Sequence, residues 1–250
     1  MVDLVIVIPT RARPATAAPL AAAFAETCTA HTLLALAVDD NDETAAEYAA
    51  GADVPLVDLD AATPDDWAGL ADRRVGVFRT PSRSMVAALN LVGVAALQGV
   101  GAFAVGFMGD DNRPRTHGWD SRFVRALRDL GTGIVYGNDL IQGERLPTQV
   151  AITADIVREL GWVAPPTLTH LYIDNFWADL GRKAGCLRYL DDVIIEHLHP
   201  LVGKADVDAG YRRVNSPVSY QAGETAYNTY LAERMTGDAE RVRALRTVRA

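Results

Sequence analysis

Short apolar runs alternate with helical segments along the first 110 residues, and this alternation constrains the fold more than any other feature of the chain. The runs cover residues 4–8, 33–38, 75–78 and 103–108. Continuous apolar runs of this length are typical of strands that are covered on both faces, as in a parallel sheet. The helical segments between them supply the crossovers that parallel strands need. They cover about residues 15–30, 43–50 and 82–98, and a further short helix is expected to start at residues 63–66. The sequence therefore predicts an α/β fold with a mainly parallel sheet flanked by helices.

The second half of the chain is less regular. Its expected strands are residues 134–136, 149–152 and 193–195. Its expected helices are residues 119–130, 153–161, 169–184, 224–235 and 238–248. No repeat, low-complexity tract or proline-rich linker divides the chain, so we expect residues 1–250 to form a single domain.

Charge and apolar content exclude several classes of protein. Lys and Arg number 24 and Asp and Glu number 32, and a net charge of -8 argues against non-specific binding to nucleic acid. Two cysteines without CxxC spacing and the absence of a signal peptide at the start of the chain predict a cytoplasmic protein. Residues 85–108 carry no charge, but Asn90, Gln98 and four glycines interrupt them, so we expect no stable membrane insertion.

Polar residues follow the strands, where an open parallel sheet binds its ligands. Residues 9–11 (Pro-Thr-Arg) follow the first strand, residues 39–40 (Asp-Asp) the second, and residues 110–112 (Asp-Asp-Asn) the fourth. No GxGxxG follows the first strand and no GxxxxGK[ST] occurs, so neither a dehydrogenase-type dinucleotide site nor a P-loop is expected.

The pair Asp110-Asp111 is the sharpest local signal. Adjacent carboxylates at the exit of a buried strand repel each other, and a cation offsets that repulsion. Oxygen ligands of this kind suit Mn²⁺ or Mg²⁺, which keep positions open for phosphate oxygens. Taken alone, such a pair after a strand is more often a helix cap or part of a loop than a metal site.

Five motifs in this order resemble those of the GT-A-fold nucleotide-sugar glycosyltransferases, in particular the inverting family 2 type. The resemblance covers residues 3–200. The motifs are residues 5–11, 38–41, 88–90, 109–114 and 151–161. The chain departs from the family at Leu89, where the family has an arginine, and at residues 161–164, where the acidic part of the family's turn is missing.

The resemblance implies a role for individual residues. The residues expected to contact the nucleotide-sugar are Pro9, Thr10, Arg11, Asp39, Asp40, Arg83, Asn90 and Asp110. Because Leu89 replaces the family's arginine, the diphosphate contact is expected from Arg83 or Arg79, with Lys204 on a loop that closes over it. Asp111 and His197 are the expected ligands of Mn²⁺ or Mg²⁺, with His199 as the second choice.

Asp174 matches the aspartate of the family's ED-like motif, although Ile173 replaces the first acid. That aspartate is the general base of inverting transfer, because a carboxylate within hydrogen-bond reach can take the proton of an attacking hydroxyl. Asp179 is a poor partner for a double displacement, since five residues along a helix turn it about 140° away. Without the resemblance, Asp174 would be interpreted as a surface aspartate.

The expected function is therefore metal-dependent transfer of a sugar from a nucleoside-diphosphate sugar to an acceptor hydroxyl, with inversion. Residues 1–112 form the expected nucleotide-binding half, residues 113–203 the acceptor-side half, and residues 204–250 a C-terminal helical extension. The acceptor (glycan, protein or small molecule) stays open, and a homodimer is compatible with the sequence. One alternative is a non-catalytic nucleotide-sugar-binding protein. The other is a sugar-phosphate nucleotidyltransferase, which normally has glycines in the first loop that residues 9–14 lack.

Overall fold

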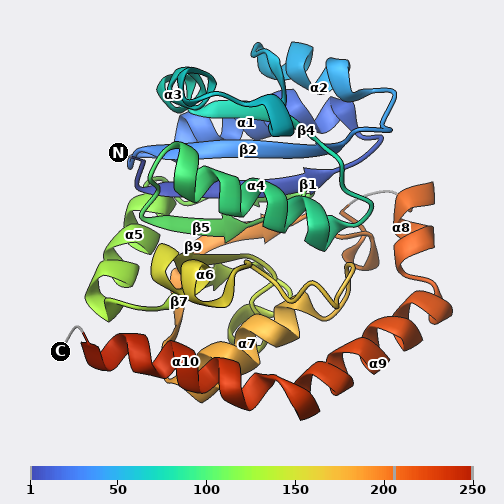
Figure 1. Ribbon diagram of the computed structural model, residues 1–250. Helices are drawn as coiled ribbons and strands as arrows, with labels where there is room; N and C mark the ends of the chain where they lie inside the picture. Colours follow the sequence, from blue (N-terminus) through green and yellow to red (C-terminus); the bar gives the residue numbers. More distant parts are fainter. Residues whose placement is uncertain (1, 205–206, 249–250) are drawn as a thin grey trace.

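A nine-stranded sheet organises the computed structural model, which describes residues 2–204 and 207–248. The strand order is β3-β4-β2-β1-β5-β8-β7-β9-β6 (Figure 1). The strands are β1 (Leu4–Thr10), β2 (Thr32–Asp39), β3 (Leu56–Asp58), β4 (Val75–Thr80), β5 (Ala104–Phe107), β6 (Asn112–Pro114), β7 (Ile134–Asn138), β8 (Val150–Thr153) and β9 (Leu187–His197).

Most neighbouring strands are parallel, as the alternation of strands and helices predicts. β1 pairs in parallel with β2 and β5, β4 pairs in parallel with β2 and β3, and β7 does so with β9. β8 runs antiparallel to both β5 and β7, and β6 runs antiparallel to β9. The predicted α/β class with a mainly parallel sheet is confirmed.

Helices cover both faces of the sheet (Figure 1). One face packs against α1 (Ala17–Thr27), α2 (Ala45–Ala52) and α5 (Trp119–Leu130). The other face packs against α3 (Pro64–Arg73), α4 (Met85–Gly99), α6 (Ala154–Leu160), α7 (Ile173–Ala184), α9 (Pro217–Glu233) and α10 (Met235–Val248). The short helix α8 (Ala209–Val214) lies beyond the sheet, at the side of the molecule where β1 and β2 end (Figure 1).

Local side-chain chemistry explains where several helices begin. Thr63 and Asp66 form a capping box at the start of α3, with Pro64 in its first turn. At α4, Ser84 caps the helix by accepting a hydrogen bond from the backbone N–H of Ala87 at 3.1 Å, so the helix begins at Met85 and not at the expected Ser82.

Some expected element bounds are wrong. The sequence predicts that α2 stops at Gly51, but the helix continues to Ala52. The next residue, Asp53, ends it by adopting a left-handed conformation with φ 55°. β3, β6 and α8 were not expected, because segments this short carry too little periodicity to detect. β9 begins at Leu187, well before the expected residue 193, since pairing with β7 extends a segment whose sequence is mixed in polarity.

The uncharged stretch over residues 85–108 contains α4 and β5, joined by a turn. In the described ranges, no helix has both the length and the apolar character needed to cross a bilayer. The stretch is instead part of the core, where Val92, Ala96 and Val105 are fully buried.

Candidate active site

The candidate site lies at the carboxyl ends of the parallel strands, as expected for an open sheet. β1 ends at Thr10, β2 at Asp39 and β4 at Thr80. Because these strands are parallel neighbours, the polar residues that follow them meet at one edge of the sheet. α8 approaches the same edge from the C-terminal part of the chain (Figure 1).

Ion pairs occupy the side of the site formed by β2 and β4. Arg11 Nη1 donates a hydrogen bond to Asp39 Oδ2 at 2.6 Å, and Ser82 Oγ donates to Asp39 Oδ1 at 2.5 Å. Arg83 Nη1 lies 2.5 Å from Asp40 Oδ1, and this hydrogen bond lowers the pKa of Asp40. The structure thus brings four predicted site residues, Arg11, Asp39, Asp40 and Arg83, into two ion pairs.

Asn90 contacts protein backbone in this structure. Its Oδ1 accepts from the N–H groups of Val163 and Ala164 at 2.8 and 3.0 Å, and its Nδ2 donates to the Ala164 carbonyl at 2.8 Å. Asn90, which lies on α4, therefore holds the turn that follows α6 against α4. A contact between Asn90 and the nucleotide-sugar stays a prediction.

Two of the other cations expected near the diphosphate also have partners elsewhere. Arg79 pairs with Asp58 at 3.1 Å on the outer strands of the sheet. Lys204 Nζ lies 2.6 Å from Glu196 Oε1. Among the described residues, neither Arg79 nor Lys204 forms a hydrogen bond or ion pair with Asp110 or Asp111, so their role at a diphosphate stays a prediction.

Asp110 is buried between β1 and a residue that the sequence analysis did not single out, Arg13. Thr10 Oγ1 donates to Asp110 Oδ2 at 2.7 Å, and Arg13 Nη1 donates to Asp110 Oδ1 at 2.8 Å. Tyr48 supports both donors, since its hydroxyl lies 3.1 Å from Thr10 Oγ1 and accepts from the Arg13 N–H at 2.7 Å. Burial raises the pKa of Asp110, although Arg13 and Thr10 oppose that shift.

Arg13 also connects the site to the C-terminal part of the chain. Its Nε donates to Asp208 Oδ2 at 2.7 Å, and Asp208 in turn caps α8 by accepting from the Tyr211 N–H at 2.6 Å. One arginine therefore bridges a buried carboxylate at the end of β5 and an exposed carboxylate at the start of α8.

Asp111 faces His197, the last residue of β9. The distance from His197 Nε2 to Asp111 Oδ2 is 3.2 Å, and β6 pairs with β9 so that Asn112 lies opposite His197. Gly109 permits this arrangement, because a Cβ at that position would lie 2.6 Å from Asp111 Oδ1. Burial acts to raise the pKa of Asp111, but the hydrogen bond and the charge of His197, together with smaller contributions from the backbone and His199, lower it overall.

Asp111 and His197 fit a divalent metal ion by their chemistry and spacing. A carboxylate and an imidazole suit Mn²⁺, and two donors on one octahedral ion at about 2.1 Å lie about 3 Å apart. His199 follows the end of β9, with its ring centroid 4.8 Å from that of His197. Within residues 2–204 and 207–248, no group of three or more His, Cys, Asp or Glu side chains is arranged to hold a metal.

Asp174 is the second residue of α7 and faces the same region. Its Oδ1 accepts from the N–H of Asn175 at 2.9 Å, and it interacts electrostatically with His197. Desolvation by the surrounding protein raises the pKa of Asp174. A carboxyl group with a raised pKa next to a candidate metal pair is the pattern expected of a general base.

His170 was not predicted from the sequence. It precedes α7, and desolvation lowers its pKa to about 4, so the imidazole is neutral at pH 7. The charges of Asp111, Arg213 and Arg13 also act on this imidazole. A single histidine in a loop gives no sequence signal, and neither do Arg13 and Asp208, which meet across the fold.

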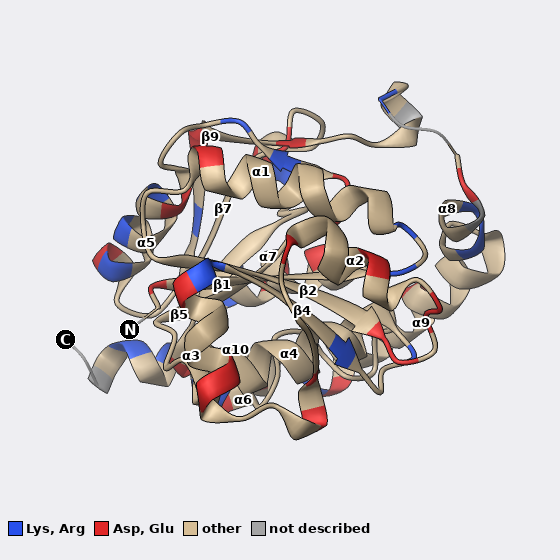
Figure 2. Ribbon diagram, turned by 90° about the horizontal axis from the view of Figure 1, so that it is seen from above, with Lys and Arg blue, Asp and Glu red and all other residues tan. Residues whose placement is uncertain are grey.

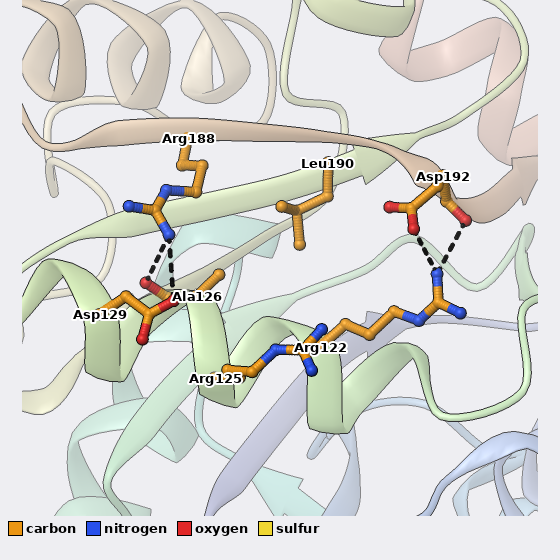
Figure 3. Close-up of a pocket in the computed structure, with 7 residues that line it drawn as sticks. All are labelled: Arg122, Arg125, Ala126, Asp129, Arg188, Leu190 and Asp192. Atoms are coloured by element: carbon orange, nitrogen blue, oxygen red, sulfur yellow. Dashed lines mark hydrogen bonds and ion pairs between the residues drawn. The ribbon is translucent and has the colours of Figure 1, made fainter.

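Charged residues also gather elsewhere on the surface. Seen from above, acidic residues lie on α2 and α3, whereas α8 carries basic residues (Figure 2). A hollow of about 170 Å³ lies between α5 and β9 (Figure 3). Its charges are largely paired, since Arg122 lies 2.6 Å from Asp192 and Arg188 lies 3.5 Å from Asp129. No residue predicted for the active site lines this hollow.

Comparison with known proteins gives matches in structure but not in sequence. No protein-family model matches the chain, and no curated protein matches it by sequence. A mannosyltransferase from Pyrobaculum calidifontis, PcManGT, solved in complex with GDP-Man and Mn²⁺, superimposes with a TM-score of 0.57 at 12% identity. That match covers 97% of this chain and 73% of the mannosyltransferase.

TarS from S. aureus is similar in fold as well. Its residues 1–349 match with a TM-score of 0.54 at 10% identity, over 94% of this chain and 73% of that one. The same fragment in complex with UDP matches with a TM-score of 0.52 at 9% identity, over 77% and 59% of the two chains. Together with the strand order and the position of the site, these matches show that the chain has the GT-A fold of nucleotide-sugar glycosyltransferases.

Proposed function

We propose that this protein is a glycosyltransferase that moves a sugar from a nucleoside-diphosphate sugar to an acceptor hydroxyl, with inversion at the anomeric carbon. The observation that carries the proposal is the Asp111–His197 pair at the carboxyl edge of a GT-A sheet, with Asp174 close enough for the charge of His197 to act on it. A base, a candidate metal pair and a polar edge then share one site.

The ends of β1 and β2 supply the donor side of this site. Thr10, Arg11, Asp39 and Asp40 present hydroxyl, guanidinium and carboxylate groups there, and these are the groups that hydrogen-bond a base and a ribose. Two similar structures support this assignment, because they were solved with GDP-Man and with UDP.

Asp111 and His197 would hold the divalent ion. When bound, Mn²⁺ or Mg²⁺ acts as a Lewis acid that offsets the negative charge of the leaving diphosphate. Asp110 is less suited to this role, because Thr10 and Arg13 each use one of its oxygens.

Asp174 would act on the acceptor. Its carboxylate takes the proton of the acceptor hydroxyl while that oxygen forms a bond to the anomeric carbon of the sugar. The bond from the anomeric carbon to the diphosphate oxygen breaks in the same step, and the nucleoside diphosphate leaves with the electron pair.

A single displacement explains why one carboxylate suffices. Asp179, the next acid along α7, accepts a hydrogen bond from the Tyr227 hydroxyl at 2.6 Å. This contact commits the Asp179 carboxylate to the packing of α9 on α7. The arrangement therefore favours inversion over a double displacement that needs a second nucleophile.

Incubation with Mn²⁺ and a panel of nucleotide-sugars tests the proposal. We expect slow release of a nucleoside diphosphate from one donor, its loss with EDTA, and its return when Mn²⁺ is added back. An α-linked donor should give a β-linked product by NMR once an acceptor is found. Binding without turnover would instead favour a non-catalytic nucleotide-sugar-binding protein. Release of pyrophosphate in a separate incubation with a nucleoside triphosphate and a sugar phosphate would favour a nucleotidyltransferase.

A further inference from the structure

We propose that Arg13 is the cation that binds the donor's diphosphate, and that it does so by exchanging its ion pair with Asp208 for the phosphate oxygens. This inference rests on the proposed function. It assigns the diphosphate contact to Arg13 in place of Arg83 or Arg79. It also makes Asp208, the residue that caps α8, a competitor of the diphosphate for Arg13.

The contacts of Arg13 leave part of its guanidinium available. Nη1 donates to Asp110 and Nε donates to Asp208, while no described residue accepts a hydrogen bond from Nη2. The side chain is 31% exposed, and a Cβ built on Gly210 of α8 would lie 3.8 Å from Nη2. A planar guanidinium with open N–H donors is suited to bind two phosphate oxygens side by side.

Arg13 is connected to the candidate metal pair through Asp110. Asp110, the partner of Nη1, is the neighbour of Asp111 in the chain. The charges of Asp111 and Arg13 also both act on the imidazole of His170. A diphosphate whose metal is held by Asp111 and His197 would therefore lie within reach of Arg13.

Other arginines are less suited to the role. Leu89, at the family's arginine position, is fully buried in the core. The half-buried Arg113 donates to the backbone carbonyls of Asp110 and Asn112. The Arg83 side chain is 63% exposed and pairs with Asp40 beyond the end of β2. Arg13 is the arginine with a direct hydrogen bond to the side chain of Asp110.

The two partners of Arg13 differ in how readily they can release it. The Asp110 side chain is 10% exposed and is also held by Thr10, whereas the Asp208 side chain is 42% exposed. An exposed carboxylate regains water when its ion pair breaks, so the loss is small. A buried carboxylate regains much less water. Asp208 is therefore the partner that a diphosphate displaces. Until Asp208 is displaced, its negative charge opposes diphosphate binding.

Three variants test this by calorimetry with a nucleoside diphosphate and Mn²⁺, and separately with the nucleoside alone. Arg13→Gln should weaken diphosphate binding about tenfold or more, because it removes charge-assisted hydrogen bonds, and should leave nucleoside binding unchanged. Asp208→Asn should strengthen diphosphate binding. Asparagine caps a helix as well as aspartate, so this change removes the charge and keeps the start of α8. Arg122→Gln, at a remote ion pair of similar exposure, should change neither affinity.

The outcomes separate this inference from the proposed function. If the unaltered protein binds a nucleoside diphosphate and Arg13→Gln binds it equally well, or loses nucleoside affinity to the same degree, Arg13 is not the diphosphate cation. If Asp208→Asn weakens or does not change diphosphate binding, the exchange is wrong; this result also decides the matter if Arg13→Gln fails to fold. If the unaltered protein binds no nucleoside diphosphate, the proposed function itself is wrong.

Discussion

The two sides of the candidate site use their carboxylates in opposite ways. At the ends of β2 and β4, acids and arginines form ion pairs near the surface, as in Arg83–Asp40, whose side chains are 63% and 38% exposed. On the other side, Asp111 pairs with a half-buried histidine, and Asp174 and His170 have pKa values shifted by desolvation.

This contrast suits the β2 and β4 side to ligand binding and the α7 side to catalysis. Exposed ion pairs contribute little to stability and exchange readily for a ligand's hydrogen bonds, so they suit the recognition of a nucleotide. Titratable groups that the protein surrounds have perturbed pKa values, which is the property that proton transfer requires. We therefore expect substitutions on the α7 side to change the rate and substitutions on the β2 side to change affinity.

The largest expected effect is that of Asp174→Asn. This change removes the base without changing the size of the side chain, so transfer should slow about 100- to 10,000-fold, while nucleotide affinity stays the same. The matched control is Asp179→Asn on the same helix, which should retain most of its activity. Steady-state rates and calorimetry of both variants check the comparison; equal losses in both would place the base elsewhere.

The pH dependence of the rate should follow Asp174. Its pKa is raised by desolvation, so the rate should rise with pH through a range above that of an ordinary aspartate. The sign for stability is opposite: a carboxyl group whose pKa is raised on folding stabilises the folded state at low pH, and this contribution is lost as pH rises through the raised pKa. Asp174→Asn should therefore lose the rising limb of residual activity and gain melting temperature at neutral pH. A rate that is flat with pH, or a lower melting temperature, would contradict this assignment.

The smallest expected effect is that of Asp40→Ala. Loss of one hydrogen bond to the nucleotide should weaken nucleoside diphosphate binding by roughly tenfold or less, with no change in the catalytic rate at saturating donor. The melting temperature should not change, because the Arg83–Asp40 pair is exposed. A lower rate at saturation, or an unchanged affinity, would break the division between the two sides.

Much of the fold is visible in the sequence because the relevant signals are local. The apolar runs over residues 4–8, 33–38 and 75–78 predict β1, β2 and β4, and the capping residues at Thr63 predict the start of α3. The polar residues after those strands could also be identified, since parallel strands bring their carboxyl ends to one edge. Which of these residues bind a ligand stays a prediction.

The tertiary structure decided what the sequence could not contain. Arg13 and Asp208 are 195 residues apart, and only the path of the chain through α8 brings them to 2.7 Å. Asn90 carries a family motif, yet the turn after α6 uses its amide group. The raised pKa of Asp174 and the lowered pKa of His170 depend on how much water the surrounding segments exclude. The sequence alone thus determined which elements form and which polar residues follow them, because those signals lie within a few residues. Packing between distant segments determined which charges pair and which groups lose water, because both depend on distances that no local pattern records.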